Sequence, residues 1–309
     1  KNCGDLVGLL EVGGFEKRVS ASKPKRVVVK VGTSSLVSDE RGALKLSSIS
    51  RVCEAITDLR ANGCEVVFVT SGAVGAGCQK AGVDRKDVTN LSQKQALAAI
   101  GQGALLRQYD DMFTELGCPV AQVLLTLDNL ASKSQYANAL STFDELFSMG
   151  VIPIVNENDT VAIEELRFGD NDTLSAQVAV MIGADWLFLL TDVDALYTAN
   201  PNKDPNAKRL EIVEDISTLS SIVETDGCGS DFGTGGMATK LTAARLASGA
   251  GCTTVICSSK KPENIQDVID GDRNFGTCIL PKKSSPPRKM FTVSPKGEVK
   301  LTVPIWQKV

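Results

Sequence analysis

The feature that most constrains the fold of this chain is a regular alternation of short β-branched runs with longer amphipathic stretches. In the longer stretches, apolar residues recur with the period of an α-helix. Strands that alternate with helices are typical of parallel βαβ units, so the sequence predicts an α/β fold: a three-layer αβα sandwich with a mostly parallel central sheet. The predicted strands cover 26–31, 66–70, 120–124, 151–156, 186–191 and 253–257, and the predicted helices cover 46–61, 90–115, 133–149, 172–182 and 239–248.

The domain organisation follows from where this alternation starts and stops. We expect one large domain over 25–283, an N-terminal extension over 1–24 and a separate C-terminal tail over 284–309. The tail begins where the composition turns basic and rich in serine and proline. Within it, 290–303 has the pattern of a β-hairpin that turns at 295–297.

The composition excludes several classes of function. No apolar run approaches the roughly 20 residues that cross a bilayer. The 37 acidic and 33 basic residues are spread along the chain without a basic stripe, so we expect neither a membrane nor a nucleic acid as a partner. The nine cysteines never form a Cys-x-x-Cys motif, and residues 1–25 show no leader. Together these features predict reduced thiols and a cytoplasmic protein.

The chain contains no histidine. This absence excludes Ser-His-Asp triads, Cys-His pairs and metal sites with histidine ligands. Any catalysis must therefore use lysine, aspartate, asparagine, serine, threonine and backbone amides.

Polar clusters lie directly after predicted strands, which is where parallel α/β sheets bind their ligands. In the first cluster, 30–35, Lys30 closes a valine-rich strand. It could meet a phosphate as a point charge, or it could simply leave the core for solvent. In the second cluster, 70–77, glycines free backbone N–H groups to bind an anion, although a close-packed structural turn explains them equally well.

Two further clusters are rich in carboxylates and carboxamides. Residues 156–159 and 169–173 could bind an ammonium group, organise lysines or hold Mg²⁺ through water. Alternatively, Asp170 or Asp172 could merely cap a helix. Residues 191–194 follow another predicted strand and could equally be a plain turn.

The one cluster that does not follow a strand opens a predicted helix, at 233–240. It combines glycine amides, two hydroxyls and a terminal lysine, which would suit a phosphate. It does not match the Walker A pattern G-x-x-x-x-G-K-[ST], so a flexible structural loop is the alternative. The order of glycines in 70–77 is likewise G-x-x-G-x-G, which is not the dinucleotide-binding fingerprint.

At these clusters the chain resembles the amino-acid kinase superfamily, and within it the glutamate 5-kinase family. Acetylglutamate kinases carry a histidine in the loop after the second strand, whereas this chain has the Thr-Ser-Gly-Ala form seen in glutamate 5-kinases. The resemblance covers about 25–277. Its most specific pieces are Val-Lys-Val-Gly-Thr-Ser at 29–34, Val-Thr-Ser-Gly-Ala at 69–73, Ile-Pro-Ile-Val-Asn-Glu-Asn-Asp at 152–159, Phe-Gly-Asp-Asn-Asp at 168–172 and Gly-Thr-Gly-Gly-Met-Ala-Thr-Lys at 233–240.

The resemblance implies ATP-dependent phosphorylation of the γ-carboxylate of L-glutamate, the first step of proline biosynthesis, with Mg²⁺ as cofactor. Lys30 and Lys240 would contact the transferring phosphoryl group, and Asp172 would orient both lysines. A homo-oligomer, feedback inhibition by proline and glutamate-5-phosphate reductase as downstream partner are also implied. Glutamate would bind to Ser71, Gly72, Ala73, Asp159 and Asn171. ATP would bind to Lys30, Thr191, Asp192, Thr234, Gly235, Gly236, Met237, Ala238, Thr239 and Lys240.

Three alternatives stay open at this point. The chain could be another kinase of the superfamily that acts on aspartate, acetylglutamate or carbamate. It could be a proline or nucleotide sensor without activity, although all the lysines and carboxylates that phosphoryl transfer needs are present. A dinucleotide-binding oxidoreductase would require the fingerprint that the chain lacks. The tail over 284–309 resembles the opening of a PUA domain, so we expect it to be a remnant or a truncated start of one.

Overall fold

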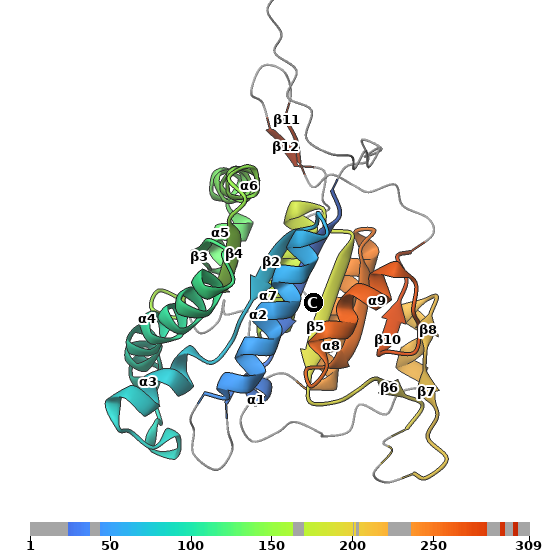
Figure 1. Cartoon of the computed structure of the whole chain (residues 1–309), viewed down its shortest axis with the longest axis horizontal. Coiled ribbons are helices and arrows are strands. Elements are labelled where there is room, and N and C mark those ends of the chain that lie inside the picture. The colour runs from blue at the N-terminus through green and yellow to red at the C-terminus, as the bar shows by residue number, and fades with distance from the viewer. Residues whose placement is uncertain are drawn as a thin grey trace, which may run out of the picture.

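The computed structural model describes residues 24–37, 44–162, 170–199, 201, 204–221, 236–282, 291–293 and 299–301. Eight of the described strands form one sheet in the order β3-β4-β2-β1-β5-β9-β10-β8 (Figure 1). All neighbours from β3 to β9 pair in parallel, whereas β10 runs antiparallel to β9. The carboxyl ends of the parallel strands therefore share one edge of the sheet.

The longer strands match the predicted β-branched runs. The short strands β10 and β8, at the edge of the sheet beyond β9, show no detectable sequence pattern. Strands β1 and β5 begin and end at the predicted residues, and the other predicted strands are displaced by one residue at most at either end. The described strands of the large sheet are β1 (Arg26–Val31), β2 (Glu65–Val69), β3 (Val120–Leu125), β4 (Ile152–Glu157), β5 (Trp186–Thr191), β8 (Ile212–Val213), β9 (Thr253–Ser258) and β10 (Thr277–Ile279). Smaller pairs are β6 (Leu196–Tyr197) with β7 (Arg209–Leu210), and β11 (Phe291–Val293) with β12 (Val299–Leu301).

The predicted helices are also present, and the described residues include four further α-helices. The bounds are α1 (Thr33–Leu36), α2 (Leu46–Ala61), α3 (Ala73–Ala81), α4 (Leu91–Glu115), α5 (Leu127–Ala131), α6 (Lys133–Ser148), α7 (Asn171–Ile182), α8 (Met237–Gly249) and α9 (Ile265–Asp270). A short 3-10 turn, η1 (Arg85–Asp87), lies between α3 and α4. Among the described helices, none is both long enough and apolar enough to cross a bilayer.

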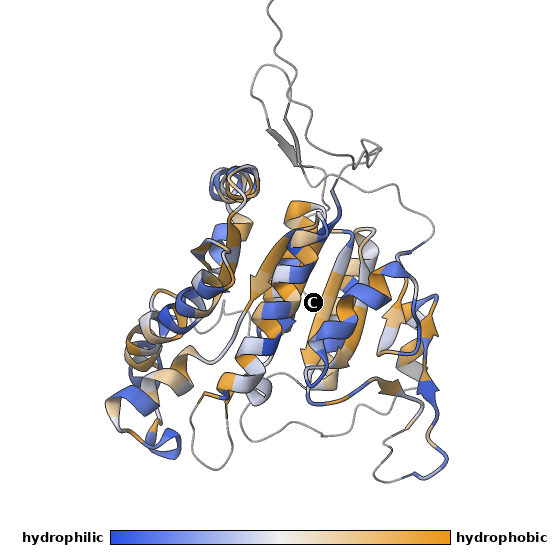
Figure 2. Cartoon of the chain, viewed as in Figure 1, coloured by the Kyte–Doolittle hydropathy of each residue, from blue (hydrophilic) through white to orange (hydrophobic). Residues whose placement is uncertain are grey.

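Helices cover both faces of the sheet, because side chains alternate between the two faces along each strand. In β1, Val27 and Val29 belong to a core formed with α2, α4 and α9, whereas Val28 belongs to the opposite core with α7 and α8. Figure 2 shows β2 and β5 as almost wholly hydrophobic strands, as expected for strands buried on both faces. The three-layer αβα sandwich and the mostly parallel central sheet are therefore confirmed.

The C-terminal tail contains the predicted hairpin strands. Strands β11 and β12 pair in antiparallel register, with Phe291 opposite Leu301. The turn predicted at 295–297 lies outside the described residues, as does most of the extension predicted over 1–24.

Helices α3 and α4 cross in close contact through two glycines. A Cβ atom added at Gly77 would lie 1.8 Å from the carbonyl oxygen of Leu97, and one added at Gly101 would lie 1.8 Å from that of Ala73. The two backbones therefore touch where no side chain fits. The glycine-rich motif at 70–77 had two interpretations, anion binding and a close-packed structural turn, and the contact at Gly77 supports the second. This packing fixes α4 against α3, the helix that follows β2.

We expect Gly77→Ala and Gly101→Ala each to lower the free energy of unfolding by about 3 kcal/mol, because the helices must separate to admit a methyl group. Urea denaturation would measure the loss. The control is Gly103→Ala on the same helix, where a Cβ meets nothing within 4 Å and alanine should stabilise the helix by up to about 1 kcal/mol. Equal effects at Gly101 and Gly103 would contradict the close crossing.

Candidate active site

A buried carboxylate bridges two buried lysines at the carboxyl edge of the sheet. Lys30 lies on the same face of β1 as Val28, so its side chain reaches toward α7 and α8. Its ammonium donates a hydrogen bond of 2.5 Å to one oxygen of Asp172, in the first turn of α7. The other oxygen lies 3.8 Å from the Lys240 ammonium and accepts a hydrogen bond of 3.0 Å from the Thr239 hydroxyl, both in the first turn of α8.

This Lys30–Asp172–Lys240 cluster carries one more positive than negative charge. The Asp172 side chain is almost fully buried, and the residue exposures of Lys30 and Lys240 are each 6%. Burial alone would raise the pKa of Asp172, but the two ammonium groups and the hydrogen bonds hold that pKa below its usual value. The carboxylate is therefore ionised at neutral pH, and its contribution to stability is lost only as the pH falls through the lowered pKa.

Burial also lowers the pKa of the Lys240 ammonium, and repulsion from Lys30 adds to this effect while Asp172 opposes it. A cation in this position is stabilised by an arriving anion. The geometry therefore prepares a site for a group that carries several negative charges, such as a phosphate.

On one side of β1, the carboxyl end of β5 and the start of α8 lie close to the lysines. Thr191 closes β5, is buried, and donates a hydrogen bond of 2.9 Å to the Asp192 carboxylate. Helix α8 begins after Gly236, and among the residues that the structure describes no side-chain cap is found for its first amides. Uncapped N–H groups at the start of a helix are a favourable site for an anion.

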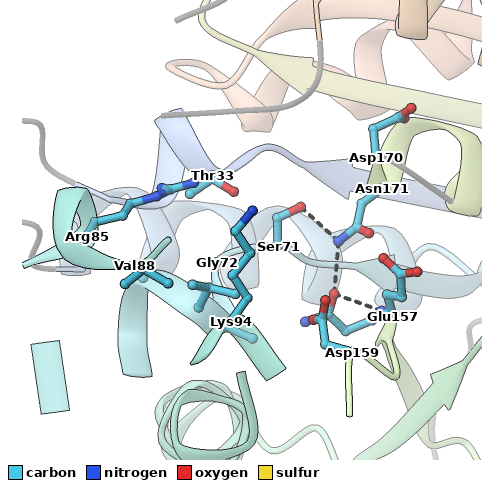
Figure 3. A pocket seen from close by; sticks show the side chains of 14 residues that line it. Thr33, Ser71, Gly72, Arg85, Val88, Lys94, Glu157, Asp159, Asp170 and Asn171 are labelled. Atoms are coloured by element: carbon cyan, nitrogen blue, oxygen red, sulfur yellow. Dashed lines mark hydrogen bonds between the residues drawn. The ribbon is translucent and has the colours of Figure 1, made fainter. Parts of the chain in front are cut away.

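On the other side of β1, the carboxyl ends of β2 and β4 and the starts of α3 and α7 surround a cavity of about 520 Å³ (Figure 3). Asp170 and Asn171, the residues that precede Asp172, contribute to its wall. The lining residues are Thr33, Ser71, Gly72, Ala73, Val74, Gly75, Arg85, Val88, Lys94, Asn156, Glu157, Asp159, Asp170 and Asn171.

Asn171 is the centre of a hydrogen-bond network at this cavity. Its side-chain nitrogen lies 2.6 Å from the Thr70 carbonyl, 2.9 Å from the Ser71 hydroxyl and 2.8 Å from the Asn156 side-chain oxygen. Asn156 is held in turn by a hydrogen bond of 2.9 Å to Gln102 of α4. The amide orientation of Asn171 is thus set by β2, β4 and α4, and no described residue donates to its side-chain oxygen.

The structure brings the residues predicted from the sequence into these places. Lys30 and Lys240, predicted to contact the phosphoryl group, and Asp172, predicted to orient them, form one cluster. The predicted nucleotide-binding residues from Gly236 to Lys240 open α8, whereas Thr234 and Gly235 lie outside the described residues. All five predicted substrate-binding residues line the cavity: Ser71, Gly72, Ala73, Asp159 and Asn171.

Asp170 and Asp172, for which capping was the alternative, divide the two roles. Asp170 caps α7 by accepting a hydrogen bond of 2.8 Å from the Thr173 amide. Asp172 instead joins the lysines. Burial raises the pKa of Asp170, although the Thr173 amide opposes that shift.

Sequence reasoning missed several residues that line the cavity, and also Gln102, which supports Asn156 from behind. Thr33 and Glu157 stand inside motifs that were recognised, so only their side-chain directions were unknown. Arg85 lies in η1 and Lys94 lies in the first part of α4, and neither stretch contains a recognisable motif. Gln102 has the spacing of an ordinary polar position on α4, and no local signal marks it.

The comparisons with known proteins show the family of the chain. The model of the amino acid kinase family matches residues 25–258. A glutamate 5-kinase from Synechococcus sp. is 55% identical over 262 residues, which cover 85% of this chain and 70% of that protein. A glutamate 5-kinase from Trichormus variabilis is 52% identical over 259 residues, which cover 84% of this chain and 70% of that protein.

Solved structures show the same fold at low sequence identity. A carbamate kinase from Giardia lamblia bound to AMP-PNP superposes with a TM-score of 0.61 at 18% identity, covering 83% of this chain and 98% of that one. A UMP kinase from Bacillus anthracis superposes with a TM-score of 0.56 at 16% identity, covering 84% and 97%. At such identities the likeness concerns the fold alone.

We expect Asp172→Asn to lower the free energy of unfolding by about 3–5 kcal/mol, because it removes the carboxylate that bridges the two buried ammonium groups. The matched control is Asp170→Asn, two residues earlier, which should change stability by less than about 0.5 kcal/mol because asparagine caps helices as well as aspartate does. Urea denaturation at pH 7 separates the two. Similar losses of unfolding free energy in both variants would show that Asp172 does not stabilise the protein through the buried charge cluster.

Proposed function

This chain belongs to the amino acid kinase family, and within it to the glutamate 5-kinases, and from this premise we propose that it transfers the γ-phosphoryl group of ATP to the side-chain carboxylate of L-glutamate. Membership of the family makes the chain a kinase. The identity of the acceptor, the role of each residue and the place of the reaction as the first step of proline biosynthesis are the proposal.

The observation that carries the proposal is the position of Lys30 between two sites. In the sheet order, β1 lies between β2 and β4, whose ends border the cavity, and β5 and β9, of which β9 contacts α8. An acceptor in the cavity and a nucleotide over β5 and α8 would approach each other across the buried lysines. Such an arrangement suits in-line transfer of a phosphoryl group.

The acceptor carboxylate needs no general base. A glutamate side chain has a reference pKa of about 4.3, so it is ionised and nucleophilic at neutral pH. The absence of histidine from the whole chain is therefore no obstacle. In the cavity, the oxygen of Asn171 and the carboxylate of Asp159 would accept hydrogen bonds from the α-ammonium group, and the Ser71 hydroxyl would hold the acceptor in place.

Charge neutralisation is what the transfer does need. The Lys30 and Lys240 ammonium groups would contact the oxygens of the transferring phosphoryl group, while Asp172 holds both lysines at the reaction centre. The amides at the start of α8 would bind the remaining phosphates, with Thr191 and Asp192 at the nucleoside end of ATP. Preorganised donors of this kind supply the main part of catalysis in phosphoryl transfer.

Magnesium fits this site as a companion of the nucleotide. Within the described residues, no group of three or more aspartate, glutamate or cysteine side chains could hold a metal ion. Mg²⁺ is commonly held by one or two carboxylates together with substrate phosphates. We therefore propose that the ATP phosphates supply most of its ligands, and that the bound ion neutralises phosphate charge.

Acceptors other than glutamate are the main competitors. Aspartate is one methylene shorter than glutamate, and carbamate has no α-ammonium or α-carboxylate group. Acetylglutamate lacks the free ammonium group from which Asp159 would accept a hydrogen bond. A sensor without activity is less consistent with a buried lysine pair placed between two binding sites. Homo-oligomerisation, inhibition by proline and delivery of the labile acyl phosphate to glutamate-5-phosphate reductase stay predictions.

We expect ATP and glutamate to yield an acyl phosphate that hydroxylamine traps as the γ-hydroxamate, with aspartate, acetylglutamate and carbamate giving far less. Lys30→Met and Lys240→Met should each lower kcat about 10²- to 10³-fold through loss of a transition-state donor. Lys25→Met, at the opposite end of β1, is the control and should keep kcat. Near-normal turnover in both active-site variants, or a preferred acceptor other than glutamate, would refute the proposal.

The lowered pKa of Lys240 predicts the pH above which the activity falls. As the pH rises through that pKa, the ammonium loses its proton and its affinity for phosphate, so kcat/KM for ATP should fall at a pH below the ordinary lysine range. Lys240→Arg should move this limb to higher pH, because a guanidinium stays protonated. An unchanged limb in the variant would show that another group controls it.

A further inference from the structure

The cavity has walls of opposite charge. Arg85 of η1 and Lys94 of α4 lie on one side, near Thr33 and Gly72, and both side chains point into the cavity (Figure 3). The other side carries three carboxylates around Asn171: Glu157, Asp159 and Asp170. A cavity polarised in this way is complementary to a ligand that has a cationic and an anionic group close together.

An α-amino acid has this pair of groups on a single carbon atom. Its ammonium matches the acidic side, and its α-carboxylate requires a cation on the other. We propose that Lys94, assisted by Arg85, is the α-carboxylate subsite of the acceptor pocket and determines its specificity for amino acids. This inference rests on the proposed function and deepens it, since it assigns the end of the acceptor that does not react.

Lys94 is held at the cavity by the local structure of α4. The helix starts with a capping box, in which the Asn90 side chain accepts a hydrogen bond of 2.9 Å from the Gln93 amide and Gln93 bonds back to the Asn90 amide. Lys94 follows directly, and α4 is fixed against α3 by the close contact at Gly101. The long side chain therefore projects from a rigid base beside the turn that begins α3.

The position of Lys94 is electrostatically unfavourable for the helix itself. A cation near the start of a helix opposes the macrodipole by about 0.3–1 kcal/mol, and the first turn of α4 has no acidic residue to offset it. No described residue forms an ion pair with Lys94. By contrast, Lys86 of the neighbouring η1 turn forms an ion pair with Asp84 at 2.9 Å. An anionic ligand would give Lys94 the partner that the helix does not.

The two walls together account for selection against close analogues. An acceptor without an α-carboxylate cannot form the ion pair with the Lys94 ammonium. An acceptor whose nitrogen is acylated has no ammonium group to donate a hydrogen bond to Asp159. Loss of a hydrogen bond to a charged group costs about 1.5–3 kcal/mol, which corresponds to a factor of about 10 to 100 in kcat/KM.

The test is a cycle between enzyme and substrate variants. The substrates are L-glutamate and L-isoglutamine, which keeps the reacting γ-carboxylate but has a neutral amide in place of the α-carboxylate. The enzymes are the parent, Lys94→Met, Lys94→Arg, Arg85→Gln and the control Lys80→Met, which alters an exposed lysine of α3 outside the cavity. ADP release gives kcat and KM for each pair.

We expect the parent and Lys80→Met to prefer glutamate over isoglutamine by about 10- to 100-fold in kcat/KM. Lys94→Met should reduce that preference to below about 3-fold, mainly by raising the KM for glutamate, and Lys94→Arg should restore most of it. Arg85→Gln should lower the preference by a smaller factor. Because Lys94 is exposed and outside the core, the variants should unfold at the parent temperature.

If Lys94→Met slows both substrates by the same factor, or leaves the preference unchanged, Lys94 does not recognise the α-carboxylate and the inference fails. That outcome leaves the proposed function intact as long as the parent phosphorylates glutamate. If the parent does not phosphorylate glutamate at all but does phosphorylate another acceptor, the proposed function fails first, and this inference fails with it.

Discussion

The ionic cluster of Lys30, Asp172 and Lys240 is the interaction on which the rest of the site depends. It joins three elements that are far apart in sequence, β1, α7 and α8, and it does so at the edge of the sheet where their ends meet. Two lysines cannot be buried side by side without a counter-charge. The carboxylate is therefore required for the two lysines to be buried together, and within this cluster it offsets one of their two positive charges.

The sheet order gives this cluster its two neighbours. The cavity lies at the ends of β2 and β4, and the start of α8 lies on the other side of β1, so the proposed sites of acceptor and donor are on separate sides of that strand. The acceptor side is held rigid by packing and by hydrogen bonds: α3 and α4 touch at Gly77 and Gly101, and Gln102 orients Asn156, which orients Asn171. Residues remote from the chemistry thus set the direction of the groups that line the cavity.

Much of this structure could be predicted from the sequence, and the remainder could not for physical reasons. Strands β1 and β5 were located to the residue because buried parallel strands are continuous apolar runs. Lys30 was singled out because it closes such a strand, and Asp172 because it stands at the start of a predicted helix, whereas their joint role was implied only by the family resemblance. Strands β8 and β10 are too short to show a period. The placement of Lys94 and Gln102 depends on which side of α4 faces the cavity, and that is decided by a helix crossing between residues distant in sequence.

A structure of the protein with ADP, glutamate, Mg²⁺ and a planar aluminium fluoride, which imitates the transferring phosphoryl group, tests the role of the cluster most directly. We expect fluoride ligands within about 3 Å of both the Lys30 and the Lys240 ammonium groups, with Asp172 still between the lysines and glutamate in the cavity opposite ADP. A mimic bound away from Lys240, or coordinated through the Asp172 carboxylate, would contradict the role assigned to the cluster.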